Sequence, residues 1–267
     1  MMWINGALAT CFFELRRSFT LQRGMVAAVL SLFPPAMVFL LLFVAFTQDA
    51  QQIVGELKMM VVLLVSLVCV LSILLWATPN VYSELEGKSW IFSASRPRGR
   101  TSLLIGKYLA SVVYSFMVCE IAISLSLLLS IIFQVPMRDA VGDWAGLSAI
   151  FLLGCLSFGA VFSLIGTLFF KRAMVIGAVY VIIVECVCGM MPSLIGKFTL
   201  QYHLRSLGLD WLGFFLPPPF EDETYKIIYG DHPQWLHLLC IGGATLVILG
   251  IATIIINWRQ YITSDET

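Results

Sequence analysis

Six apolar stretches constrain this chain more than any other feature, because each is long enough to cross a lipid bilayer as a helix. They comprise residues 25–46, 59–79, 108–133, 144–170, 173–195 and 236–257. A hydrocarbon core about 30 Å thick needs about 20 apolar residues in a helix, since every backbone amide there must be bonded within its own segment. The sequence therefore predicts an all-α membrane protein with six transmembrane helices. Pro34 and Pro35 lie within the first stretch, where two missing amide donors predict a kink or an interruption.

The composition leads to the same fold class. Hydrophobic residues make up 60% of the chain and charged residues only 12%, whereas soluble domains contain about 25% charged residues. The exterior of the folded chain must therefore be largely apolar and face lipid. The formal net charge is zero, which argues against a nucleic-acid-binding protein, because such a protein needs a basic face. We expect residues 1–267 to form a single transmembrane domain whose surroundings are the lipid bilayer.

Residues 1–24 precede the first apolar stretch and mix apolar with charged side chains. Glu14, Arg16 and Arg17 interrupt the apolar residues, so the segment lacks the basic start and unbroken apolar block of a cleavable signal peptide. Its apolar residues recur mostly every three or four positions, at Trp3, Ala7, Leu8, Cys11 and Leu15. This spacing predicts an interfacial helix that lies in the headgroup plane. A frayed cytoplasmic tail is the alternative.

The distribution of Lys and Arg predicts the orientation of the six helices. One predicted side holds eleven of the 16: Arg16, Arg17, Arg23, Lys88, Arg96, Arg98, Arg100, Lys107, Lys171, Arg172 and Arg259. Because basic residues favour the cytoplasmic side, we expect a multi-pass protein of the plasma (inner) membrane with both termini cytoplasmic. Two connections are long, a cytoplasmic segment over 84–107 and an outer segment over 197–235. Loops of this size commonly have a function.

Catalytic and metal-binding patterns give little signal. The sequence contains no G-x-x-x-x-G-K-[ST], H-E-x-x-H or G-x-S-x-G motif, so we expect that the chain is not an enzyme and that any energy from ATP comes from another chain. His203, His232 and His237 fall at or near the predicted outer face, which favours a solvated or headgroup-contacting role. The seven cysteines nearly all lie in apolar stretches and are predicted to be small packing residues, with no metal site, disulfide framework or cofactor: Cys11, Cys69, Cys119, Cys155, Cys186, Cys188 and Cys240.

The cytoplasmic segment over 84–107 is the most informative stretch. It begins with acidic residues and a glycine, continues with a short apolar block and a basic, proline-containing turn, and returns to the membrane at Gly106-Lys107. An apolar block on a cytoplasmic loop favours binding to a partner surface. A basic anchor that only fixes the topology is the alternative.

This segment resembles the cytoplasmic loop of ABC-2 type permeases, the membrane subunits of ABC exporters, and the layout of the whole chain is similar to theirs. The resemblance implies a coupling helix in the loop that binds a separate ABC ATPase subunit, and a second permease copy or homologue that completes the exporter. It assigns ATPase coupling to Glu84, Glu86, Gly87, Trp90, Ile91, Phe92, Arg96, Pro97 and Arg98. Lys88 stands where the family commonly has a threonine or a similar small polar residue.

Glu120 and Glu185 interrupt two of the apolar stretches. A carboxylate at membrane depth costs several kcal/mol unless it is paired, protonated or facing water, so both are intramembrane polar candidates. They either line a transport pathway or form structural hydrogen bonds with Ser, Tyr or helix-end amides. Two other classes of function stay open, an ion- or proton-coupled secondary transporter that uses both glutamates, and a membrane scaffold that transports nothing.

Overall fold

The computed structural model describes residues 2–18, 20–45, 50–86, 98–132, 140–169, 171–188, 196–212 and 233–259, and all regular elements within these ranges are helical. The elements are α1 (Met2–Ser18), α2 (Leu21–Ala45), α3 (Ala50–Ala77), α4 (Asn80–Glu86), α6 (Gly99–Ile132), α7 (Ala140–Leu168), α8 (Ala173–Tyr180), the π-helix η1 (Val181–Cys188), the 3-10 helix η2 (Gly196–Phe198), α9 (Leu200–Leu212) and α11 (Gln234–Trp258). The prediction of an all-α protein is confirmed for the described residues.

Five helices are long and apolar enough to cross a membrane. They cover Leu21–Phe43, Met60–Glu86, Gly99–Ile132, Val141–Leu168 and Gln234–Trp258, and they correspond to five of the six predicted spans. The predicted span over 173–195 corresponds to α8 and η1, a shorter apolar helix over Ala173–Cys188. That helix would extend only about 24 Å, less than the thickness of a hydrocarbon core. Residues 189–195 lie outside the described residues, so the sixth crossing stays a prediction.

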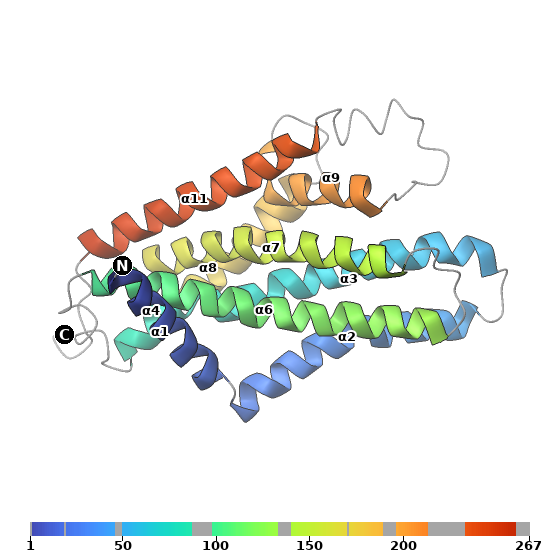
Figure 1. Ribbon diagram of the computed structural model, residues 1–267, viewed down its shortest axis with the longest axis horizontal. Helices are drawn as coiled ribbons and strands as arrows, with labels where there is room; N and C mark the ends of the chain where they lie inside the picture. The colour runs from blue at the N-terminus through green and yellow to red at the C-terminus, as the bar shows by residue number, and fades with distance from the viewer. Residues whose placement is uncertain are drawn as a thin grey trace.

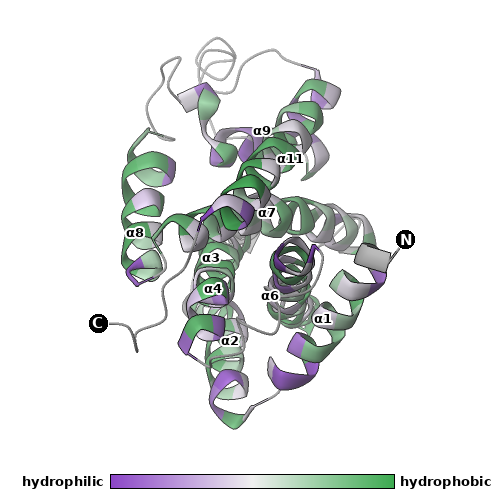
Figure 2. Ribbon diagram, turned by 90° about the vertical axis from the view of Figure 1, so that its left-hand side faces the viewer, coloured by the Kyte–Doolittle hydropathy of each residue, from purple (hydrophilic) through white to green (hydrophobic). Residues whose placement is uncertain are grey.

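Three helices, α3, α6 and α7, pack against one another at the centre of the protein (Figure 1). Helix α2 packs on α6 and α3, α1 crosses α6, and α9 and α11 lie on the α7 side. Buried apolar side chains such as Val65, Ile123 and Phe158 form the core between the central helices. In contrast, α2 and α11 expose many large apolar side chains, and Figure 2 shows their ribbons as mostly green. Exposed apolar faces of this extent are suited to lipid.

The N-terminal part of the chain tests two predictions. The predicted helix over 1–24 is present as the shorter α1, which buries Ala7 and Cys11 and exposes Phe12. Pro34 and Pro35 lie inside α2, which is continuous, so of the two predicted alternatives, a kink or an interruption, the interruption does not occur. The helix instead bends along its length (Figure 1), as expected where two backbone donors are missing.

Basic side chains gather at one end of the helix bundle. Arg100, in the first turn of α6, donates to the backbone oxygens of Asn257 and Arg259 at the end of α11. Arg259 in turn donates to the backbone oxygens of Thr167 and Leu168 at the end of α7. The last carbonyl groups of a helix lack partners within it, and the negative end of the helix dipole attracts cations. These arginines therefore stabilise the ends of α7 and α11 beside the start of α6.

Candidate functional site

The candidate site is the base of the segment over 84–107. Helix α3 ends before a two-residue turn that contains Pro79, since a proline removes a backbone donor and restricts the residue before it. Helix α4 follows at once, and α6 begins at Gly99, directly after Arg98 with a φ of 58°. The helices thus include more of the segment than the sequence predicts. Residues 87–97 lie outside the described residues.

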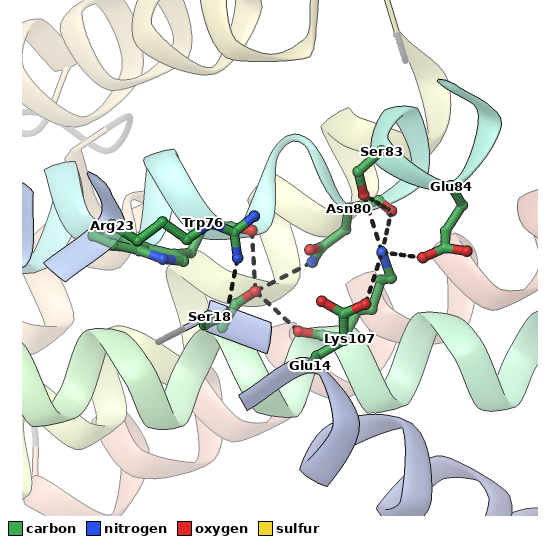
Figure 3. A network of polar contacts seen from close by, with 9 residues as sticks. Glu14, Ser18, Arg23, Trp76, Asn80, Ser83, Glu84 and Lys107 are labelled. Carbon is green, nitrogen blue, oxygen red and sulfur yellow. Dashed lines mark hydrogen bonds and ion pairs between the residues drawn. The ribbon is translucent and has the colours of Figure 1, made fainter. Parts of the chain in front are cut away.

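Lys107 is at the centre of this site (Figure 3). Its Nζ lies 2.7 Å from Oε1 of Glu84 and 3.4 Å from Oε1 of Glu14. It also donates to Oγ of Ser83 at 3.0 Å and to the backbone oxygen of Asn80 at 3.1 Å. The three nearest acceptors match the three N–H groups of the ammonium, and Glu14 adds a longer ion pair. Side chains of α1, α4 and α6 therefore meet at one cation.

We name Glu14, Glu84 and Lys107 the charge triad. The exposed fractions of their side chains are 12%, 7% and 3%, so all three charges are largely withdrawn from solvent. Burial of a charge is costly unless the charge is paired and hydrogen-bonded, and the Lys107 ammonium meets both conditions. Glu84, which the resemblance assigns to ATPase coupling, is thus bonded inside the protein. Glu86, two residues later, is exposed at the end of α4.

A second polar group joins the end of α3 to α6 beside the charge triad. The hydroxyl of Ser111 lies 3.1 Å from the backbone oxygen of Trp76 and 2.9 Å from that of Lys107, and it accepts a hydrogen bond from Nδ2 of Asn80 at 3.2 Å. The rings of Trp76 and Tyr114 lie 4.6 Å apart. Since Ser111 and Lys107 are one turn apart, a single face of α6 holds both the end of α3 and α4.

Helix α1 approaches α6 closely at Gly106. A Cβ atom added to this glycine would lie 2.6 Å from the backbone oxygen of Ala7 and 2.6 Å from Cβ of Thr10. Any side chain at position 106 would therefore push α1 away from α6. The missing side chain of Gly106 thus allows Glu14 to reach Lys107, the next residue along α6.

The remaining residues assigned to coupling fall into two groups. Arg98 is exposed in the turn that leads into α6. The others lie outside the described residues: Gly87, Trp90, Ile91, Phe92, Arg96 and Pro97. The described residues thus cover both flanks of the predicted loop. Glu14 and Lys107 were absent from the predicted coupling residues, although Lys107 directly precedes the third apolar stretch on the predicted cytoplasmic side; Glu14 belongs to the predicted interfacial helix.

The two glutamates that are predicted to lie within the membrane have different surroundings. Glu185 is buried and accepts hydrogen bonds from the Tyr180 hydroxyl at 2.7 Å and from the backbone N–H of Gln201 at 2.9 Å. Gln201 is the second residue of α9, so the carboxylate binds an otherwise unbonded amide at the positive end of that helix. Glu120 of α6 has a buried Oε1 without a hydrogen-bond partner among the described residues. Glu185 therefore has the structural partners that the sequence suggested as one alternative.

Two histidines meet between α9 and α11. The Nδ1 atoms of His203 and His237 lie 2.8 Å apart, and Nε2 of His237 lies 3.1 Å from Oγ of Ser206. His237 is fully buried. The predicted solvated or headgroup-contacting role is therefore wrong for His237, because α9 covers the first turn of α11. This contact could not be predicted from the sequence, since residues 203 and 237 belong to separate helices.

Comparison of the sequence with models of known protein families and with curated proteins finds no match. The functional interpretation therefore depends on the residues themselves. The strongest of these observations is the buried charge triad at the base of a loop whose sequence suits a protein partner.

Proposed function

We propose that this chain is the membrane-spanning permease subunit of an ATP-driven ABC transporter, an exporter that a separate ATPase subunit powers. The observation that best supports this function is the charge triad, which fixes the base of the segment that would bind the ATPase. Residues 87–97 contain the apolar block and two basic residues, Lys88 and Arg96. Aromatic and arginine side chains are enriched where proteins bind one another. ATP hydrolysis belongs to the partner, because the chain has no nucleotide-binding motif.

In the proposed coupling, movement of residues 87–97 is transmitted to α6. Helix α4 and the first turns of α6 flank this segment, and the 2.7 Å ion pair between Glu84 and Lys107 holds the flanks together. Helix α6 has 34 residues and extends about 51 Å, so a tilt at its first turn displaces its far end. Helix α1 moves with it, since Glu14 and the close contact at Gly106 join the two. Closure of the ATPase subunits would then tilt α1 and α6 as one unit.

The proposed assembly contains two permease copies or homologues in the plasma (inner) membrane. Each has six crossings, with residues 173–195 as the fifth, an interfacial α1 and both termini in the cytoplasm. The basic end of the bundle supports this orientation, because Arg100, Lys107 and Arg259 lie there and basic residues favour the cytoplasmic side.

A photo-crosslinking residue in place of Trp90 tests the proposed function. The full chain is expressed in its native membrane, irradiated, and purified, and the crosslinked products are probed with radioactive azido-ATP. We expect a product that contains an ATP-binding polypeptide. Trp235, exposed at the far end of α11 from the basic end, provides the matched control position. Deletion of 87–97 should abolish co-purification of the ATPase while the chain still inserts into the membrane.

Two crosslinking results would contradict the proposal. One is the absence of any ATP-binding polypeptide among the products from position 90 in membranes where the chain is functional. The other is equal crosslinking of such a polypeptide from position 235. Labelling of a single cysteine at position 90 from outside the cell would also refute it, since the loop must then face away from the ATPase.

An ion- or proton-coupled secondary transporter is the second candidate, and the buried Oε1 of Glu120 favours it. The ABC permease and the secondary transporter differ in their energy source. Export of a fluorescent apolar dye from sealed vesicles by such a carrier should persist without ATP, collapse with a protonophore, and fail in Glu120→Gln. Export that requires ATP and is unchanged in Glu120→Gln excludes the carrier.

A further inference from the structure

Three cysteines from the three central helices converge in the core. Cys69 of α3, Cys119 of α6 and Cys155 of α7 have their Sγ atoms all within 4.8 Å of one another, and those of Cys69 and Cys155 lie 3.5 Å apart. The side chains are buried, with exposed fractions of 2%, 0% and 0%. The sequence predicts only packing residues at these positions. Packing alone does not require three sulfur atoms from separate helices to face one another.

The spacing of the sulfur atoms suits a metal ion at their centre. Metal–sulfur bonds in protein sites are about 2.3 Å long. Three sulfurs around one ion in a plane therefore lie about 4.0 Å from one another. The observed separations, 3.5 Å for one pair and at most 4.8 Å for the others, are compatible with this value. Sulfurs in a disulfide are about 2.05 Å apart, so the pair at 3.5 Å is not already bonded.

We propose that Cys69, Cys119 and Cys155 form a binding site for a soft monovalent cation, Cu(I). Soft sulfur ligands select Cu(I), zinc or iron–sulfur clusters. Structural zinc sites take four ligands in a tetrahedron, whereas the described residues bring three ligand atoms together here. A monovalent ion also leaves less charge to bury, and burial of charge in an apolar core is costly.

Binding at this site involves proton release and no electron transfer. Each sulfur that ligates Cu(I) as a thiolate gives one proton to solvent, and a sulfur that stays a thiol gives none. One thiolate with two thiols yields a neutral site, and two thiolates with one thiol yield a single negative charge. The bound ion would join α3, α6 and α7 at the centre of the protein, independently of any transport function.

The experiment uses the full chain, purified in detergent under anaerobic, reducing conditions and titrated with Cu(I) against a chromophoric Cu(I) chelator. We expect about one Cu(I) per chain to resist the chelator. Cys155→Ser should lose this uptake, whereas Cys240→Ser, which alters a partly exposed cysteine of α11, should keep it. Saturation should raise the apparent melting temperature of the wild type by about 5 °C and leave that of Cys155→Ser unchanged.

X-ray absorption on the loaded wild type provides a readout that needs no variant. Three sulfur neighbours at about 2.3 Å are expected. Cys119→Ala replaces Cys155→Ser if the latter does not fold. Three outcomes would each overturn the proposal. The absorption spectrum could show nitrogen or oxygen neighbours around the copper, or the protein could retain Zn(II) in preference to Cu(I). The third outcome is that Cys155→Ser or Cys119→Ala takes up as much Cu(I) as the wild type.

Discussion

Replacing Lys107 by methionine tests whether the charge triad stabilises the fold. The variant keeps an apolar side chain of similar length but removes the ammonium that lies 2.7 Å from Glu84 and 3.4 Å from Glu14. Removing one partner of a buried ion pair costs about 3–5 kcal/mol, because the remaining charge stays buried without compensation. Glu14 is the more exposed of the two glutamates and water can partly solvate it, so we expect a loss near the lower end, about 3 kcal/mol.

A second substitution separates charge from packing. In the Lys107→Met background, Glu84→Gln removes the negative charge that is left behind and should recover about half of the lost stability. Lys171→Met is the matched control, since Lys171 is an exposed lysine in the turn after α7. An exposed substitution of this kind should change the free energy of unfolding by no more than about 0.5 kcal/mol.

The assay is reversible unfolding of each purified variant in mixed micelles with increasing SDS, followed by tryptophan fluorescence and circular dichroism. If Lys107→Met unfolds at the same SDS fraction as Lys171→Met, the triad contributes no net stability and the reasoning from burial fails. A further loss of stability on adding Glu84→Gln would show that the Glu84 carboxylate still stabilises the fold without Lys107, and would refute this reasoning.

Three other substitutions or measurements test features outside the charge triad. Gly106→Val should lower the free energy of unfolding by about 1–3 kcal/mol, because its Cβ would lie 2.6 Å from the backbone oxygen of Ala7. Gly24→Ala, whose Cβ would have nothing within 4 Å, should not lower it. Equal losses of stability in the two variants would contradict this reasoning. Glu185→Leu should lower the melting temperature more than Glu185→Gln, which keeps an acceptor for the α9 amide, and the reverse order would refute the capping role. Burial raises the pKa of the Cys11 thiol, so the rate of Cys11 alkylation, measured on its peptide, should be lower than the rate for a free thiol. This rate should rise about tenfold per pH unit up to the raised pKa, because only the thiolate reacts. A rate that is independent of pH would contradict the raised pKa.

The sequence predicts the long helices well because the length of an apolar run is a local property. Five predicted spans have counterparts in α2, α3, α6, α7 and α11. The start of α6 shows where this reasoning fails, since the sequence placed residues 99–107 in a loop. Arg100 and Lys107 are polar, yet Arg100 bonds the end of α11 and Lys107 bonds α4. Tertiary partners therefore extend this helix beyond its apolar run.

The candidate site could be predicted only in part. The acidic residues and the apolar block identified the loop, because both are adjacent in sequence. The burial of Glu84 depends on its ion pair with Lys107, 23 positions later in the sequence, and Lys107 in turn contacts Glu14 from another helix. The meeting of Cys69 with Cys155 likewise depends on which faces of α3 and α7 turn toward each other. A single sequence gives the spacing of such residues along each helix but not the rotation of one helix against the next.

The charge triad also raises the question of why charges, rather than apolar side chains, join α1, α4 and α6. Replacing a buried ion pair by well-packed apolar residues is often neutral or stabilising, so stability alone does not explain it. Charges do fix one register, because Lys107 has its nearest carboxylate at 2.7 Å only when α4 is in its present position. A triple variant, Glu14→Leu with Glu84→Leu and Lys107→Met, should therefore unfold within about 1 kcal/mol of the wild type while the amides of α4 exchange hydrogen faster. Unchanged exchange in α4 would mean that packing, and not the triad, holds the base of the loop in place.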